Sequence, residues 1–141
     1  MGEVNVEESL LVGAPPDTVY GVLVDPKHHE RILPEAFVDF KSEDGSEATF
    51  SLKMGGIKRD FKIRTEQTEQ NRLFREMDVN TNIVTEFRLE PHEQGTLVTI
   101  ATKYNTNRSV SGLIESLVAP IFLRQLYKEE LVKLGRYVLL I

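Results

Sequence analysis

The chain has 141 residues, no cysteine, and a net charge of −5 from 17 basic and 22 acidic side chains. This length suits one domain spanning residues 1–141, which can bury a core without a metal ion or a disulfide. The lack of cysteine excludes disulfides and thiol nucleophiles, and the acidic balance argues against nucleic acid as a partner. No apolar stretch approaches the roughly 20 residues that span a bilayer, so we expect a cytoplasmic protein that is not an integral membrane protein.

The N-terminal part predicts one strand followed by two short helices. Residues 4–12 alternate apolar and polar side chains, which is typical of a half-buried strand. Prolines and aspartates at 15–17 and at 25–26 begin the two helices, with Asp25 as the N-cap of the second. Pro34 ends that helix, because the residue before a proline avoids the helical region. Its inner face is predicted to carry His29, Ile32 and Leu33.

From residue 36 onward the sequence alternates with a period of two, which predicts six more strands. Turn signals such as Asp44-Gly45 and Gly55-Gly56 separate these strands. Together with residues 4–12 they form an antiparallel seven-stranded sheet with one apolar face, and this face needs a cover. The six runs of alternation cover residues 36–41, 48–54, 57–64, 73–79, 85–89 and 98–104.

A long C-terminal helix is predicted to cover the apolar face of the sheet. It begins at Ser109 or Ser111, and about 28 helical residues give a length on the order of 40 Å. Pro120 lies inside this helix and is predicted to kink it, because proline lacks an N–H and clashes with the preceding turn. The half before the kink, residues 109–119, is predicted to be the more mobile and to act as a lid. The expected fold is therefore α+β: a curved sheet wrapped around one long helix, with two short helices between its first and second strands.

This order of elements resembles the START-like, or helix-grip, superfamily, which includes pollen-allergen-like (Bet v 1-like) and polyketide cyclase/dehydrase-like (SRPBCC) proteins. The resemblance covers nearly the whole chain and rests on "APPDTVYGVLVDP", "ILPEAFVDF", "EQGTLVTIATKY" and "FLRQLYKEELVKLGRYV". The segment "VDPKHHERILPEAFVDF" also resembles the quinone-binding Coq10-type branch, although the Trp-containing strand and Gly-Pro-Phe element of that branch are missing. The resemblance implies a cavity between sheet and helix that holds a lipid, quinone, polyketide or plant hormone.

Two polar residues are predicted to hold the polar end of such a ligand. Alternation places Arg59 on the inner face, where its guanidinium, with Tyr104, would bind a carboxylate-bearing amphiphile. Alternatively, Arg59 reaches solvent at the rim near the Gly55-Gly56 turn, or it forms an ion pair with Glu8. The predicted apolar lining consists of Phe50, Leu52, Phe61, Ile63, Met77, Phe87, Ile100, Leu117 and Ile121.

Other polar residues each have two interpretations. Glu8 and Arg75 break the apolar alternation. Each contacts either a ligand or an ion-pair partner, which is the other of the two or Arg59. His28 and His29 are adjacent on a helix and point about 100° apart, so a solvated helix face is favoured over a metal site. Inward-facing hydroxyl groups either orient a ligand or are satisfied inside the core. They belong to Thr85, Thr102, Tyr104 and Tyr127.

The favoured function is binding of a hydrophobic or amphipathic small molecule, without a cofactor or an assigned catalytic residue. A G-x-S-x-G motif, a phosphate loop and a dinucleotide fingerprint are all missing from the sequence. One alternative is a polyketide cyclase/dehydrase-like enzyme, in which a polar cavity residue assists proton transfer. Another is a protein-interaction module that uses the C-terminal "YVLLI", in a monomer or a homodimer.

Overall fold

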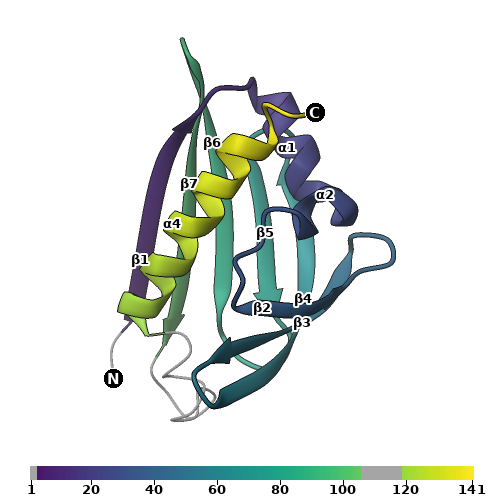
Figure 1. Cartoon of the computed structure of the whole chain (residues 1–141), viewed down its shortest axis with the longest axis vertical. Helices are drawn as coiled ribbons and strands as arrows, with labels where there is room; N and C mark the ends of the chain where they lie inside the picture. The colour runs from purple at the N-terminus through teal and green to yellow at the C-terminus, as the bar shows by residue number, and fades with distance from the viewer. Residues whose placement is uncertain (1–2, 106–118) are drawn as a thin grey trace.

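One curved antiparallel sheet lies against a C-terminal helix in the computed structural model, which describes residues 3–105 and 119–141 (Figure 1). The elements are β1 (Glu3–Val12), α1 (Pro16–Val24), α2 (Pro26–Glu30), β2 (Phe37–Lys41), β3 (Glu47–Met54), β4 (Ile57–Glu69), β5 (Leu73–Asp78), β6 (Val84–His92), β7 (Gly95–Asn105) and α4 (Pro120–Tyr137). The seven strands in the described residues follow the order β1-β7-β6-β5-β4-β3-β2. Strands β2 to β7 thus form a meander, and β1 joins it beside β7. The predicted α+β helix-grip architecture is confirmed.

The two short helices form where the sequence predicts them. The Asp25 side chain accepts a hydrogen bond of 3.0 Å from the backbone N–H of Lys27, and Pro26 occupies the first turn of α2. Because α1 and α2 are separate, the chain changes direction between them. Both helices turn an inner face toward the protein, with Leu23 of α1 and His29 of α2 buried.

The C-terminal helix is shorter than predicted. It begins at Pro120, and Ala119 before it is extended, with φ −58° and ψ 142°. Pro120 therefore starts α4 instead of kinking a longer helix, which suits a residue that lacks an N–H and has a fixed φ. The predicted helical segment and lid before it lie almost entirely outside the described residues. No helix in the described part of the chain is long and apolar enough to cross a membrane.

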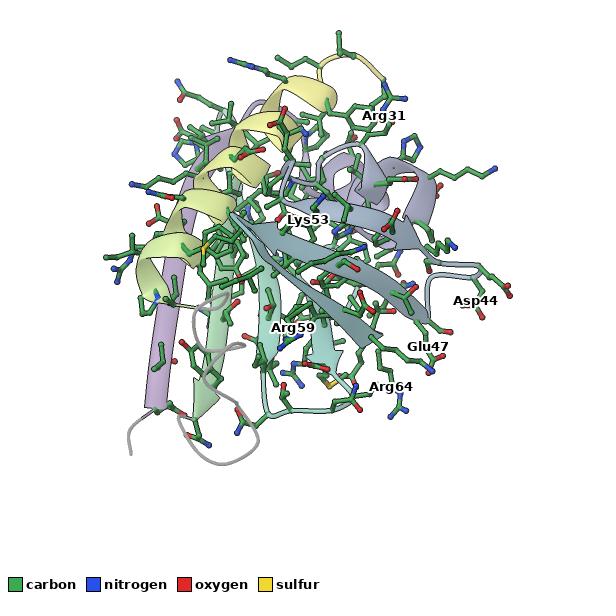
Figure 2. The ribbon with its side chains drawn as sticks, turned by 60° about the horizontal axis from the view of Figure 1, so that its bottom comes forward. Arg31, Asp44, Glu47, Lys53, Arg59 and Arg64 are labelled. Carbon is green, nitrogen blue, oxygen red and sulfur yellow. The ribbon has the colours of Figure 1, made fainter. Side chains whose placement is uncertain are left out.

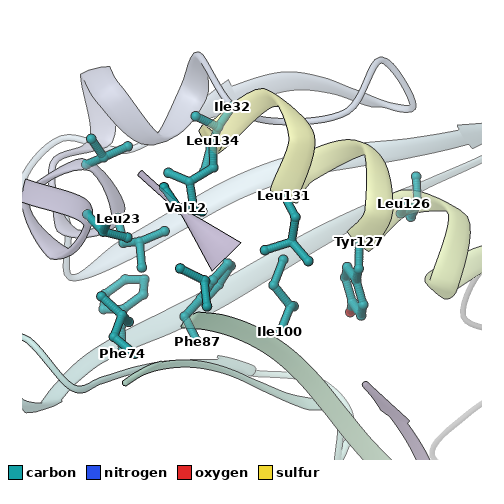
Figure 3. Packing of buried hydrophobic residues seen from close by; sticks show 14 of the residues in the cluster. Val12, Leu23, Ile32, Phe74, Phe87, Ile100, Leu126, Tyr127, Leu131 and Leu134 are labelled. Carbon is teal, nitrogen blue, oxygen red and sulfur yellow. The ribbon is translucent and has the colours of Figure 1, made fainter. Parts of the chain in front are cut away.

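Helix α4 crosses the concave face of the sheet and divides the interior into two parts. Its C-terminal half closes a solid core, where Leu131 and Leu134 point toward the sheet (Figure 3). The facing strands contribute Phe87 and Ile100, which are 2% and 0% exposed. The N-terminal half of α4, with Leu126 among its inner residues, covers a cavity instead.

The β6–β7 turn depends on a glycine that packs against the end of β1. Gly95 has φ +140°, and a Cβ atom there would lie 2.0 Å from the carbonyl oxygen of Val12. An L-residue side chain thus meets both backbone strain and a clash with main-chain atoms that cannot rotate away.

We expect Gly95→Ala to lower the free energy of unfolding by about 2 kcal/mol or more, the scale of a strained backbone position plus a steric clash. Gly56→Ala is the matched control, because a Cβ at Gly56 meets nothing within 4 Å. That control should stay within about 0.5 kcal/mol of the wild type. Urea denaturation measures both changes, and equal midpoints for the two variants would contradict the packing of Gly95.

Candidate functional site

A cavity of about 80 Å³ lies between the sheet and the N-terminal half of α4. Most of its wall is aromatic or aliphatic. Five of the predicted lining residues belong to the wall, namely Phe50, Leu52, Phe61, Ile63 and Phe87. The wall also contains Leu33, which was predicted on the inner face of the second helix, and apolar residues that the sequence did not single out, namely Phe37, Phe40, Ile83, Leu123 and Leu126.

Other predicted lining residues lie elsewhere. Met77 is on the convex face of the sheet beside Arg75, and Ile121 is 73% exposed, so the predicted inward orientation of both is wrong. Ile100 and Tyr104 are buried in the core but do not form part of the cavity wall. Leu117 lies outside the described residues.

Arg59 faces the concave side, as its alternation predicts, but does not reach the cavity. It is half-buried near the start of β4 (Figure 2). Its cross-strand partner is Leu52 on β3. This position near the Gly55-Gly56 turn matches the rim alternative, and a ligand contact by Arg59 stays a prediction. Glu8, also half-buried, lies opposite Ile100 on β7 and outside the cavity wall.

Arg75 is an ion-pair residue of the convex face. Its guanidinium lies 2.8 Å from a carboxylate oxygen of Glu86 and 3.6 Å from one of Glu66. Burial alone would raise the pKa of Glu86, but hydrogen bonds from Arg75 and Arg88 outweigh it and hold this pKa below its usual value. Arg75 therefore belongs to a structural ion-pair network, as one of its two interpretations predicted, but its partners are Glu66 and Glu86 instead of the predicted Glu8.

Three ionisable side chains meet at one end of the cavity, and we call them the His–Glu cluster: His29 of α2, Glu76 of β5 and Glu130 of α4. The Nε2 atom of His29 lies 3.8 Å from a carboxylate oxygen of each glutamate. The Nδ1 atom donates a hydrogen bond of 2.7 Å to the carbonyl oxygen of Leu23, because a carbonyl can only accept. This bond fixes the ring so that Nε2 faces the two carboxyl groups.

The histidine of this cluster is buried, which confirms its predicted place on the inner face of α2 and corrects the prediction of a solvated helix face for His29. His29 is 4% exposed, and its ring stacks on Phe40 with centroids 6.2 Å apart. Phe87 meets the same ring edge-on at 5.6 Å. The aromatic surroundings exclude water from one side of the cluster and lower the local dielectric constant.

Burial raises the pKa of both glutamates. The pKa of Glu130 lies well above its ordinary value, chiefly because the side chain is buried and also because Glu76 is near; Lys133 acts in the opposite direction. Burial likewise raises the pKa of Glu76, and the opposing charge of His29 reduces that effect. Groups this close influence one another's titration, so the observed pKa values belong to the cluster and not to single residues.

Glu130 is 3% exposed, and its Oε2 atom has no hydrogen-bond partner among the described residues. The nearest ring nitrogen, Nε2 of His29, is 3.8 Å away, beyond hydrogen-bonding distance. A buried polar atom without a partner typically costs about 1–3 kcal/mol. The protein therefore retains an unfavourable acceptor at the cavity, and a bound donor group would satisfy it.

A chain of hydroxyl groups runs along the cavity wall beside the cluster. Tyr127 hydrogen-bonds through its hydroxyl to Thr102, and Thr102 to Thr85 at 2.7 Å. Thr85 is in turn the cross-strand neighbour of Glu76. Burial raises the pKa of Tyr127, so its hydroxyl stays protonated and available as a hydrogen-bonding group. The predicted inward orientation of these three hydroxyl residues is confirmed.

Asp78 also lines the cavity, but its carboxylate is already bound within the turn after β5. One oxygen accepts from the backbone N–H of Asn80 at 3.0 Å, and the other from the Thr81 hydroxyl at 2.8 Å. Within the described residues, no group of three or more His, Cys, Asp or Glu side chains is suited to hold a metal ion. The polar chemistry of the cavity thus comes from the His–Glu cluster and the hydroxyl chain.

Signals for this cluster were present in the sequence. Glu130 continues a spacing of four with Leu126 and Leu134, so helical periodicity alone places it on the inner face of α4. Glu76 shares a face with Phe74 by the period of two in β5. What the sequence does not contain is the distance between these two glutamates, which belong to elements more than 50 residues apart.

The raised pKa of Glu130 predicts a pH-dependent stability. Between the ordinary value of 4.5 and the raised value, the folded protein binds more protons than the unfolded chain, so stability falls as pH rises through this window. We expect Glu130→Gln to reduce the loss of unfolding free energy between about pH 5 and pH 8 by about 1–3 kcal/mol. Glu90→Gln, at an exposed position of β6, makes the same charge change and should leave the profile unchanged.

Urea titrations at several pH values measure this effect. A Glu130→Gln profile parallel to that of the wild type would show that ionising this carboxyl group costs no stability.

Solved structures with the same fold align with nearly the whole chain. The KanY protein aligns with a TM-score of 0.83 and 26% identity over 98% of this chain and 99% of its own. Norcoclaurine synthase from Thalictrum flavum, in complex with dopamine and hydroxybenzaldehyde, aligns with a TM-score of 0.74 and 15% identity over 98% and 87%. Ara h 8.0201 aligns with a TM-score of 0.69 and 13% identity over 98% and 99%. The chain is similar to the last two in fold.

Sequence comparison identifies the family. No curated protein sequence matches the chain significantly. A family model described as polyketide cyclase / dehydrase and lipid transport matches residues 3–139, which is nearly the whole chain. The chain therefore belongs to the polyketide cyclase / dehydrase and lipid transport family.

Proposed function

We propose that this domain binds a small amphipathic molecule in the cavity beneath α4. The apolar body of the ligand contacts the aromatic wall, and its polar group contacts the His–Glu cluster. The observation that carries this proposal is the unpartnered, buried Oε2 of Glu130 beside an apolar cavity. A buried acceptor costs stability, and such a cost is typical of a site that a ligand completes. The family description, which includes lipid transport, supports an apolar ligand.

The volume limits the size of the ligand. Pockets for drug-sized ligands are roughly 300–1,000 Å³, several times larger than the 80 Å³ found here. A ligand of about one ring therefore fits with modest side-chain movement, whereas a long acyl chain requires a larger cavity. Burying apolar surface contributes about 25 cal/mol per Å², so a single-ring ligand is expected to bind weakly, at millimolar to micromolar concentrations.

A second candidate function is acid–base catalysis on the bound ligand. The observation that favours it is the pairing of two carboxyl groups of raised pKa with an oriented imidazole in a largely apolar cavity. An acid–base pair of this kind can move a proton next to a carbonyl group: one member removes the proton from carbon while another protonates the carbonyl oxygen.

A cavity-filling substitution tests the binding site. Leu126→Phe on the cavity side of α4 should weaken binding of benzyl alcohol by about tenfold or more, because the added ring atoms occupy the ligand's volume. Ile121→Phe on the same helix adds a ring at a residue that is 73% exposed, and should leave the affinity unchanged. NMR chemical-shift titration measures both. Equal weakening by the two substitutions, or no binding to the wild type, would contradict the proposed site.

Proton exchange tests the catalytic candidate. In D2O the wild type should exchange the protons next to the carbonyl of phenylacetone faster than buffer alone. Glu130→Gln should reduce the enzymatic rate by about 100-fold, the scale of general acid–base catalysis. The exchange requires no co-reactant, since each proton removed from carbon is replaced by a deuteron from the solvent. An exchange rate equal to that of buffer would leave binding as the only function of the cavity.

A further inference from the structure

The ionisable groups in the cavity wall are predominantly acidic. Glu76, Asp78 and Glu130 supply three carboxyl groups, whereas His29 is the one basic side chain in the described part of the wall. Arg59 lies outside that wall, contrary to the expectation that it would meet an anionic ligand group. A carboxylate-bearing ligand would therefore add a negative charge to a site already built from acids.

The three acids differ in how far the protein satisfies them. Both oxygens of Asp78 accept hydrogen bonds from its own turn. The Nε2 atom of His29 lies 3.8 Å from a carboxylate oxygen of Glu76 and of Glu130, and Oε2 of Glu130 has no hydrogen-bond partner among the described residues. That distance is too long for a hydrogen bond, so these two carboxyl groups face the cavity with acceptor capacity to spare.

From this arrangement we infer that the ligand carries a protonated amine, which binds between Glu76 and Glu130 while its apolar body contacts the aromatic wall. This inference rests on the proposed binding function and specifies its ligand class. An alkylammonium group brings three N–H donors and a positive charge, and both are missing from this end of the cavity. A hydroxyl group brings one donor and no charge, and a carboxylate brings no donor and a negative charge.

Amine binding should be coupled to protonation of the cluster. A cation stabilises ionised carboxylates, so the amine competes with protons that the buried cluster otherwise holds. The groups that act on Glu130 are Glu76 from β5, His29 from α2, and Tyr127, Glu129 and Lys133 from α4 itself. Lys133 is engaged elsewhere, since its Nζ donates to the carbonyl oxygen of Leu33 at 2.6 Å. The amine affinity should therefore rise with pH as the cluster loses protons.

The test compares three ligands with one ring and different head groups: benzylamine, benzyl alcohol and benzoate. NMR titration of the wild type at about pH 7.5 should show benzylamine binding about tenfold or more tighter than benzyl alcohol, and benzoate weaker than both. Between about pH 5.5 and pH 7.5 the benzylamine affinity should increase, while the benzyl alcohol affinity stays nearly flat.

Substitutions show which residues cause the preference for benzylamine over benzyl alcohol. Glu130→Gln keeps the shape of the side chain, removes its charge, and should abolish most of the preference for benzylamine over benzyl alcohol. Glu76→Gln should act in the same direction. Glu90→Gln, which removes a charge from an exposed position of β6, should leave the preference intact. Because the preference is a ratio of two affinities for one variant, a general loss of stability does not imitate it.

The possible results separate this inference from the proposed function. Binding of benzyl alcohol without a preference for benzylamine over benzoate would overturn the amine and leave the cavity as a binding site. Binding of none of the three ligands would overturn the proposed function as well. Preferential benzoate binding that is lost in Arg59→Met would overturn the amine in favour of Arg59 as an anionic-ligand anchor.

Discussion

The packing of α4 across the concave face of the sheet is the contact on which the rest of the structure depends. One half of the helix completes a solid core through Leu131 and Leu134, and the other half covers a cavity. Glu130 lies at the boundary between these halves, where the helix brings its carboxyl group to His29 and Glu76. The same element therefore provides the stability of the fold and the chemistry of the cavity.

Stability and function are opposed at this boundary. A leucine at position 130 would suit the core side of α4, whereas the glutamate is buried without a hydrogen-bond partner for Oε2. The surrounding structure holds the cluster in place: the Asp25 cap and Pro26 fix α2, and the Leu23 carbonyl orients the imidazole. A preorganised polar site of this kind loses little conformational entropy when a ligand binds, which partly offsets the weak driving force from a small cavity.

Local signals explain why the fold was predictable. The Asp25 cap, the glycine turns and the period-two alternation each act within a few residues, and all of them agree with one architecture. The site was less predictable because polar residues on inner faces break the apolar pattern from which orientation is inferred. In β5 the inner face carries Glu76 and Asp78, while Met77 points outward. The assumption that the apolar Met77 faces inward therefore assigned the wrong face of β5 to the cavity. The proximity of Glu76 and Glu130 arises only from tertiary packing.

The central claim is that burial raises the pKa of the Glu130 carboxyl group in the cavity, and that a bound cationic ligand lowers this pKa again. Selective ¹³C labelling of glutamate side chains, with NMR titration of the Glu130 carboxyl carbon, measures this claim directly; Glu130→Gln assigns the signal. The account predicts a pKa above the ordinary range of glutamate in the free protein, and a downward shift of that pKa when benzylamine is bound. Titration of Glu130 in the ordinary range of an exposed glutamate, unchanged by benzylamine, would contradict it.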